Sequence, residues 1–416
     1  MAHASTVQTM SLPQDIPAVA RQTVPVTRAR DPRLDFYRGL AMFIIFLAHV
    51  PSNWWALWIP ARFGFSDATE MFVFCSGMAS AIAFGGSYER RGWVIGTARV
   101  SYRVWQIYWA HIALFFLAAS FLSAIDYFGD FEKIYIGSLN LWKFFADPGP
   151  QLIGLFTLTY VPNFFDILPM YMIVLLMMPM MMALSRVNMW LVAGAVVLIW
   201  FFAQGRLLGV IGLEHLHLKL PAEPWSERPW FFNPFGWQLV FFTGFALMRG
   251  WIPKPPVCRT LIVSALVIVI SFIFMSHFAI RILQLEWVPE WRRDNLVWIT
   301  KTDFGILRYV HFLALAYLGW VIAGEGGKRL LIQSEGFAAD AGRMLVKFIS
   351  KVGQQSLAVF LTSLILALVA GLVLDVIGRS NFVLLVLNLT AFCVLIATAY
   401  LVSWYKSQPW KKSATG

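Results

Sequence analysis

The stretch RLDFYRGLAMFIIFLAH (residues 33–49) opens with charged side chains, runs apolar over 39–48 and closes on a histidine. A helix needs about 20 residues to cross the hydrocarbon core of a bilayer. With the tryptophan-rich residues after it, this stretch predicts a transmembrane helix at about 36–57. Comparable runs follow at 68–86, 104–127, 164–184, 189–211, 232–250, 259–284, 304–323, 354–377 and 381–404. Together they predict an all-α, polytopic integral membrane protein of about ten transmembrane helices.

The composition agrees with a membrane bundle. Of the 416 residues, 59% are hydrophobic and 13% are charged, whereas soluble domains carry about 25% charged residues. So few polar side chains do not cover a water-soluble globule. The net charge of +11 is spread over short connectors between the apolar runs rather than gathered on a folded basic surface, so we expect no nucleic-acid partner.

The distribution of Lys and Arg predicts the orientation. The chain ends and the connectors after every second run hold nearly twice as many of these residues as the opposite connectors. By the positive-inside rule, both termini then lie in the cytoplasm. Residues 1–32 are polar, contain prolines and lack the apolar core of a signal peptide. We therefore expect a disordered cytoplasmic N-terminal tail at 1–32, one membrane domain at 33–405 and a cytoplasmic C-terminal tail at 406–416.

The long inner connector, 325–353, has a helical pattern of its own. Arg343, Lys347 and Lys351 recur every four residues with apolar residues between them. This spacing predicts a basic amphipathic helix that lies on the anionic inner leaflet.

Arg38 and His49 form the clearest polar pair inside the predicted membrane region. Eleven residues separate them, which is about three helical turns, so both lie on one face of the first helix, roughly 16 Å apart along its axis. Ionisable groups in the bilayer core are costly and by default suggest function. Taken singly, each also has an ordinary structural explanation: a packed core histidine, and an arginine whose charged end reaches the membrane surface.

Further polar side chains fall near the outer ends of other runs. Glu70 starts the second run at about the depth of His49, where a carboxylate can orient an imidazole and stabilise its charged form. Asp166 starts the fourth run, and Arg308 and His311 share one face of the eighth. The structural alternatives are a helix-start charge for Glu70 and an ordinary Asp–Arg ion pair for Arg308.

Two groups of side chains are candidates for substrate contacts. Arg99 and Arg103 lie four residues apart after the second run, where guanidinium groups suit a phosphate ligand; topology signalling also explains them. Trp54 and Trp55 belong to the tryptophan-rich outer connectors. They fit either an aromatic belt at the membrane surface or a platform on which sugar rings stack.

Several of these stretches together resemble the membrane acyltransferase-3 superfamily. Arg38 and His49 match its R-x10-H spacing, and EMFVFCSG (70–77) is similar to its DLFFVLSG-like stretch, with Glu70 at the acidic position. An arginine-rich stretch at 99–103 and a GxxSLxxF pattern at 353–360 also fit. FFDILPMY (164–171) and LRYVHFLALAY (307–317) are most similar to the OpgC-type succinyltransferases of osmoregulated periplasmic glucans. The resemblance covers residues 33 to about 405, and departs at Cys75, where Leu is common, and at 103–108, which lack an RxYP-type motif.

The resemblance implies a transmembrane O-acyltransferase of the bacterial inner membrane. It would move an acyl group, succinyl in the OpgC type, from cytoplasmic acyl-CoA to hydroxyls of a periplasmic glucan. Acyl-CoA is then a co-substrate, and no permanently bound cofactor is expected. The expected catalytic residues are His49 as general base, Glu70 orienting it and Asp166 supplying a further hydrogen bond. The donor would meet Arg38, Arg99 and Arg103; the acyl group or acceptor would meet Arg308, His311, Trp54 and Trp55.

Two other functions fit the same residues. A glycan flippase or exporter would use the tryptophan-rich outer surface and the intramembrane charges without any chemistry. An acetyltransferase acting on lipopolysaccharide or another polysaccharide would show a donor preference that does not depend on Arg308. We expect no metal, because the two imidazoles of His215 and His217 are too few ligands to indicate a metal site.

Overall fold

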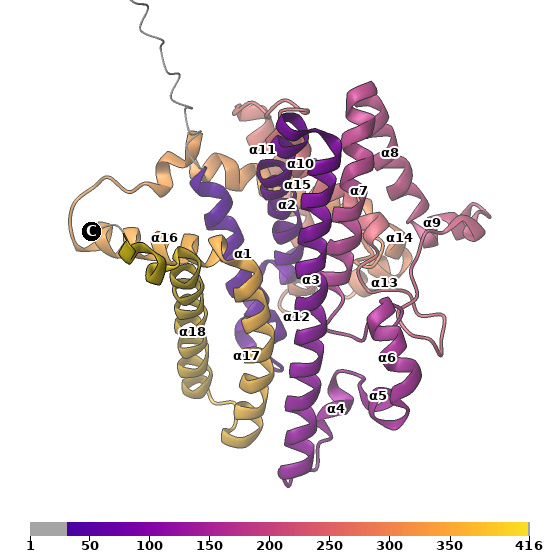
Figure 1. Ribbon diagram of the computed structural model, residues 1–416, viewed down its shortest axis with the longest axis vertical. Coiled ribbons are helices and arrows are strands. Elements are labelled where there is room, and N and C mark those ends of the chain that lie inside the picture. The colour runs from indigo at the N-terminus through magenta and orange to yellow at the C-terminus, as the bar shows by residue number, and fades with distance from the viewer. Residues whose placement is uncertain (1–30, 415–416) are drawn as a thin grey trace, which may run out of the picture. The chain divides into compact units, whose positions relative to one another are not determined.

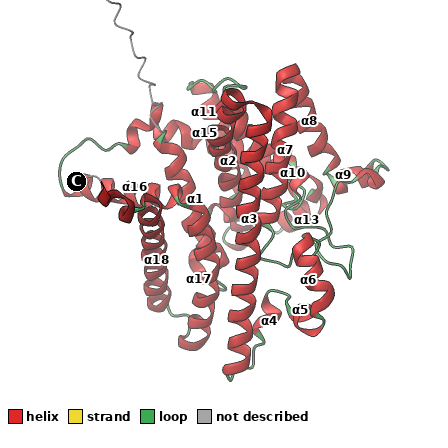
Figure 2. Cartoon of the chain, viewed as in Figure 1, coloured by secondary structure: helices red, strands yellow, loops and turns green. Residues whose placement is uncertain are grey.

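The computed structural model describes residues 31–414, which fold as one compact unit. The expected N-terminal tail, 1–32, falls outside the described residues except for its last two. Helices make up about three-quarters of the described chain, and loops and turns the rest (Figure 2). Residues 31–414 contain no β-strand; Pro221 and Pro229 form one isolated bridge.

The longer helices are α1 (Pro32–His49), α2 (Ala68–Ser80), α3 (Gly86–Phe128), α7 (Ile167–Val187), α8 (Met189–Phe202), α10 (Pro234–Arg249), α11 (Arg259–Ile273), α15 (Ile306–Ala323), α16 (Phe337–Gln354), α17 (Ser356–Ile377) and α18 (Asn381–Ser407). The shorter ones are α4 (Tyr135–Ser138), α5 (Trp142–Ala146), α6 (Pro148–Thr157), α9 (Gly205–Val210), α12 (His277–Arg281), α13 (Trp287–Asp294) and α14 (Leu296–Ile299). A π-helical turn at Ala81–Gly85 joins α2 to α3. Short 3₁₀ turns lie at Trp54–Trp58, Pro60–Arg62, Glu214–Leu216, Glu325–Leu330 and Pro409–Ala414.

All ten predicted runs fall on helices, but the helices differ in length. Five helical segments within residues 31–414 are long and apolar enough to cross a membrane: Ala68–Phe128, Ile167–Val187, Ile306–Ala323, Ser356–Ile377 and Asn381–Lys411. The first contains two of the predicted runs. Gly92 interrupts it, because its φ of 80° is outside the helical region. The chain is therefore an all-helical membrane protein as far as the structure describes it.

Several predicted boundaries are wrong for local reasons. Run 36–57 ends as a helix at His49, because Val50 precedes Pro51 and takes an extended conformation. Run 259–284 is divided in two, because the Ser276 side chain caps a new helix by accepting hydrogen bonds from Phe278 N and Ala279 N. At the C-terminal end, α18 continues to Ser407, beyond the predicted end at 404; Gln408 then takes a left-handed conformation, and a separate 3₁₀ turn follows at Pro409–Ala414.

The predicted amphipathic helix of connector 325–353 is α16, which runs crosswise to α18 (Figure 1). It packs against α1 through two glycines. A Cβ on Gly39 would lie 1.8 Å from the Ile349 carbonyl oxygen, and a Cβ on Gly353 would lie 1.8 Å from that of Asp35. Only glycine permits such an approach of two backbones, so these contacts fix how α1 sits in the bundle.

The helices reach different depths beside α1. Arg38 on α1 is hydrogen-bonded to Ser356 at the start of α17, and Pro51 lies against Gly371 on the same helix, so α1 and α17 run side by side in one direction. Near the far end of α17, Asp375 accepts hydrogen bonds from Lys133, in the loop after α3, at 2.7 Å and from Tyr135, the first residue of α4, at 2.9 Å. In Figure 1, α17 and α18 extend past the level at which α2 begins.

Candidate active site

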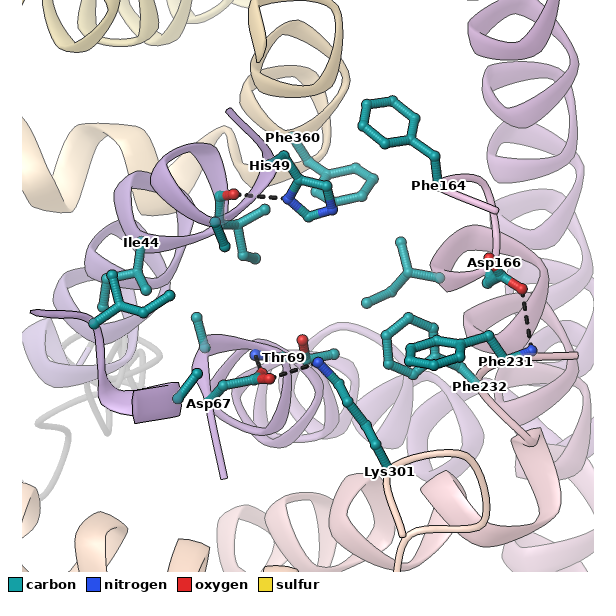
Figure 3. A pocket seen from close by; sticks show the side chains of 16 residues that line it. Ile44, His49, Asp67, Thr69, Phe164, Asp166, Phe231, Phe232, Lys301 and Phe360 are labelled. Atoms are coloured by element: carbon teal, nitrogen blue, oxygen red, sulfur yellow. Dashed lines mark hydrogen bonds and ion pairs between the residues drawn. The ribbon is translucent and has the colours of Figure 1, made fainter. Parts of the chain in front are cut away.

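A cavity of about 180 Å³ lies where the C-terminal end of α1 meets the N-terminal ends of α2 and α7 and the loop before α15. Its polar side chains are His49, Asp67, Thr69, Asp166 and Lys301; the rest of its wall is apolar. Figure 3 shows His49, Asp166 and the Asp67–Lys301 pair around the same hollow. An apolar cavity with a few convergent polar groups is the usual form of a small-molecule site.

His49, the last residue of α1, has a defined tautomer. Its Nδ1 lies 2.7 Å from the carbonyl oxygen of Ile45, one turn earlier on the same helix. A carbonyl only accepts hydrogen bonds, so Nδ1 carries the proton and the neutral ring keeps a lone pair on Nε2. The edge of the Phe164 ring packs against the imidazole, with ring centres 5.3 Å apart. The structure therefore presents His49 at the cavity wall as a proton acceptor.

The expected pair of His49 and Glu70 does not form. Glu70 is fully buried and both of its oxygens are engaged: Oε1 accepts from Arg308, and Oε2 accepts from the backbone N–H of Asp67 at 2.8 Å. Neither Glu70 nor Arg308 belongs to the cavity wall. The reason is local, because Glu70 completes the capping box of α2 and so points back at the start of its own helix.

Arg308 and His311 lie behind the wall rather than in it. Arg308 donates to Glu70 from Nε at 2.8 Å and from a terminal nitrogen at 2.5 Å. His311 is buried, and its Nδ1 accepts from the backbone N–H of Ser66 at 3.2 Å. The two residues do lie on one face of α15, as predicted, but that face holds the loop before α2 in place.

The charged pair that does line the cavity is Lys301 with Asp67. The Lys301 ammonium group lies 2.5 Å from Asp67 Oδ2, and Asp67 also caps α2 by accepting from the backbone N–H of Thr69. Burial raises the pKa of the Asp67 carboxyl, but the positive charges of Lys301 and Arg308 outweigh it and hold that pKa well below its usual range. The ion pair with Lys301 therefore favours the ionised form of Asp67. Neither Asp67 nor Lys301 is among the site residues that the sequence predicts.

Asp166 lies in the cavity wall, at the start of α7. Its Oδ1 accepts from the backbone N–H of Phe231 at 3.1 Å, which ties the start of α7 to the loop before α10. Of the three residues expected to be catalytic, the structure thus brings His49 and Asp166 together around one cavity and leaves Glu70 outside it.

Trp54 and Trp55 stand outside the cavity wall. They lie in the 3₁₀ turn Trp54–Trp58 after α1, with ring centres 6.2 Å apart, and Trp54 is exposed. The turn is anchored by Asn53, whose side chain accepts from Trp55 N and donates to Asn388 on α18. Ile59 and Ala61, just beyond this turn, do line the cavity. The tryptophans are therefore close in sequence to the wall but form no part of it.

The three expected donor-binding arginines occupy two environments. Arg38 is hydrogen-bonded to Ser356, at the start of α17. The neighbouring Gln355 accepts from Lys406 at 2.7 Å. Arg99 and Arg103 lie on α3 and bond to Ser87 and Gln106 respectively. Arg38 and His49 lie on one unbroken helix, so their separation along its axis is about 16 Å, as predicted.

Within residues 31–414, no group of three or more His, Cys, Asp or Glu side chains is placed to hold a metal ion. His217 instead lies 3.6 Å from Asp303. The polar groups of the cavity are a base, two carboxyls, a hydroxyl and an ammonium group. Such a set suits proton transfer and the binding of a charged ligand.

Comparisons with known proteins identify the family. No curated protein and no solved structure matches the chain. The sequence does match the family described as OpgC protein, over residues 30–407, which is nearly the whole chain and every element that builds the cavity. The chain therefore belongs to the OpgC protein family, and this membership indicates a glucan-modifying membrane enzyme of the acyltransferase type.

Proposed function

We propose that this protein transfers an acyl group, succinyl, from acyl-CoA to hydroxyl groups of a periplasmic glucan. The observation that carries the proposal is His49: in a chain of the OpgC family, a single histidine lies in the wall of an apolar cavity, with Nδ1–H bound to Ile45 and the Nε2 lone pair unused by that bond. This is the form of imidazole that general-base catalysis requires.

In the proposed reaction, His49 Nε2 takes the proton of a sugar hydroxyl as that oxygen attacks the thioester carbonyl carbon. The tetrahedral intermediate then breaks its C–S bond, and the imidazolium returns the proton to the sulfur that leaves. The ester and free CoA are the products. The Ile45 carbonyl holds Nδ1–H throughout, so a backbone dipole stabilises the imidazolium where a carboxylate was expected. Asp166, in the same wall, supplies a further hydrogen bond.

The donor would enter from the end of α1 that carries Arg38. The CoA head group is a polyanion and would stay beside Arg38 and the start of α17. Its uncharged pantetheine arm would extend along α1 over the roughly 16 Å that separate Arg38 from His49. Phe360, one turn after Ser356, forms the cavity wall on that side and stacks on Phe72 with ring centres 6.0 Å apart. In this proposal the arm passes Phe360.

The acceptor would enter from the opposite side. We propose ten membrane crossings with both termini in the cytoplasm of a bacterium and the protein in its inner membrane, so that α2, α7 and α15 begin on the periplasmic side. From Phe360 in the cavity wall, α17 continues to Ile377 for about 25 Å. The cavity would then lie deep beneath the outer ends of α17 and α18. Because the cavity would lie so deep, the acyl group would have a shorter path from the cytoplasmic side to the acceptor.

Mass spectrometry of periplasmic glucans tests the proposal. Cells that carry the gene are compared with cells that lack it and with cells that produce His49→Gln. We expect the mass increment of succinyl groups only with the wild-type gene. A glucan that keeps its succinyl groups without the gene refutes the proposal, and an acetyl increment in their place indicates the acetyltransferase alternative.

A second measurement separates a transferase from an exporter. Membranes that contain the protein are incubated with acyl-CoA labelled in the acyl group and with glucan isolated from the deletion strain. A transferase moves the label to the glucan and releases free CoA. An exporter moves glucan between compartments and leaves the label on CoA.

A further inference from the structure

We infer that Lys301 selects the acyl donor: its ammonium group binds the distal carboxylate of a dicarboxylic acyl chain while the thioester carbonyl faces His49. The inference rests on the proposed acyl transfer and names the residue that decides between a charged and an uncharged acyl group. It replaces Arg308, which the sequence suggested for this role.

Burial and bonding exclude Arg308 from the role. Its side chain is 8% exposed, it is absent from the cavity wall, and it already donates two hydrogen bonds to Glu70. The Lys301 side chain is 30% exposed and lies in the wall. Among the described residues of the wall, Lys301 is the one lysine or arginine, and His49 is the one other basic side chain. A carboxylate in the cavity therefore meets Lys301 first.

Lys301 has the capacity for a second carboxylate. An ammonium group has three N–H donors, and the hydrogen bond that it makes in the structure goes to Asp67 Oδ2 at 2.5 Å. The ammonium nitrogen also lies 5.9 Å from the ring centre of Phe231 and 5.5 Å from that of Phe232, which favours a charged group there without using a donor. A ligand carboxylate can therefore bind without displacing Asp67.

The position of Lys301 is fixed at both ends of the residue. The buried indole of Trp237 donates to the Lys301 carbonyl oxygen at 2.9 Å, and Asp67 holds the ammonium group. A cation held in place in this way loses little side-chain freedom when a ligand binds, and such preorganisation favours selectivity. Asp67 is thus a positioning residue for Lys301.

The charge balance also favours a dicarboxylic donor. In the ion pairs beside the cavity, Lys301 and Arg308 balance Asp67 and Glu70, while Asp166 lies apart from them in the wall, bonded to Phe231 N. A ligand carboxylate adds one negative charge, and the imidazolium that forms at His49 during transfer adds one positive charge. The donor carboxylate therefore stabilises the charged state of the base through the low-dielectric cavity, and a neutral acyl chain of equal length does not.

The test compares two donors in one assay. The full chain, in membranes, is given succinyl-CoA or butyryl-CoA, which has the same four carbons with a methyl group in place of the carboxylate. The acceptor is glucan isolated from the deletion strain. The measured quantity is the ratio of kcat/KM for succinyl-CoA to that for butyryl-CoA.

We expect Lys301→Met to lower this ratio about tenfold or more, because it removes a charge-assisted hydrogen bond to the succinyl carboxylate that butyryl-CoA does not make. Lys301→Arg keeps the charge and should keep most of the preference. The matched control is Lys133→Met, which removes a lysine from another Lys–Asp pair, at the far end of α17.

Other results overturn the inference. It fails if Lys301→Met leaves the ratio unchanged, if both donors lose the same factor, or if the wild-type protein uses butyryl-CoA as well as succinyl-CoA. In each of these cases acyl transfer itself still stands. A wild-type protein that transfers neither acyl group refutes the proposed function instead, so the two failures are distinguishable.

Discussion

Arg308 donates both of its hydrogen bonds to one oxygen of Glu70, and the buried ion pair stands directly behind Asp67, whose Oδ2 lies 3.8 Å from the same guanidinium group. The four charges of Lys301, Asp67, Arg308 and Glu70 thus form a row from the cavity wall into the protein. Those at the cavity end are available to a ligand. Those at the buried end hold the start of α2 against α15.

Glu70→Ala should destabilise the fold rather than act on the chemistry alone. It leaves the buried Arg308 guanidinium without its hydrogen-bonded partner, with Asp67 at 3.8 Å as the remaining carboxylate, which costs up to about 3–5 kcal/mol. We expect a lower melting temperature of the detergent-solubilised protein. The double variant Glu70→Ala/Arg308→Met should regain much of this loss, because it removes the unpaired charge as well.

Lys328→Ala is the matched control for the Glu70 variant, because it breaks an exposed Lys328–Glu325 pair and should leave the melting temperature unchanged. If the double variant of Glu70 and Arg308 is no more stable than Glu70→Ala, the pair does not carry the stability assigned to it.

His49→Gln should do the opposite of Glu70→Ala, because it should lower the transfer rate and leave the stability of the fold unchanged. Glutamine retains a polar side chain but accepts no proton, so we expect transfer to fall by about 10²–10⁴-fold, the usual contribution of a general base. The melting temperature should stay close to that of the wild type, because His49 is only half-buried. Turnover of labelled acyl-CoA and thermal unfolding are measured on the same preparation.

The control for His49 is His215→Gln, an exposed histidine in the turn Glu214–Leu216, which should leave both quantities unchanged. Wild-type rates in His49→Gln would remove this histidine from the mechanism.

Much of the fold was predictable because apolar length and charge placement are local properties of the sequence. The runs at 68–86, 164–184, 304–323, 354–377 and 381–404 all lie in helices long enough to span a membrane. The end of α1 at His49 was also within reach, since Pro51 follows two residues later. The predicted runs 36–57 and 259–284 are too long, because the tryptophan-rich segment after α1 and the segment around Ser276 do not continue the helices before them.

The site was predictable only in part, because sequence alone does not say which of several neighbouring charges faces inward. Asp67 and Glu70 are three residues apart and lie at a similar depth, so by sequence either one could face the cavity. The capping box of α2 turns Glu70 back toward Arg308 and leaves Asp67 at the cavity. Lys301 lies in a loop, where helical periodicity gives no orientation. The sequence shows charged residues at the outer ends of these runs, but the contacts between helices decide which of them face the cavity.

The Asp67–Lys301 pair predicts a pH dependence of stability. Lys301 and Arg308 hold the pKa of the Asp67 carboxyl below the value of about 3.9 that it has in an unfolded chain. A carboxyl with a lowered folded-state pKa stabilises the protein fully above its unfolded pKa, and this contribution is lost as the pH falls toward the folded value. Wild type should therefore exceed Asp67→Asn in melting temperature by a constant amount above about pH 5, and by less as the pH falls below 4.

Asparagine is the appropriate substitution at residue 67, because it also caps helices and so keeps the bond to Thr69 N. Asp130→Asn, at an exposed loop residue, is the control. A stability difference that does not change with pH would show that the ion pair of Asp67 with Lys301 does not contribute to stability.

The last prediction concerns the crossing of α1 and α16, on which the position of His49 depends. Gly353→Ala places a methyl group about where the Asp35 carbonyl now lies, since the two would be 1.8 Å apart. The helices must separate, which costs about 1–3 kcal/mol, as for other overpacked sites. Because α1 carries His49 at its far end, we expect a fall in transfer rate together with a lower melting temperature. Gly194→Ala on α8 meets nothing within 4 Å and should be neutral or slightly stabilising. If Gly353→Ala keeps both wild-type stability and wild-type rate, the close contact of α1 with α16 does not set the geometry of the site.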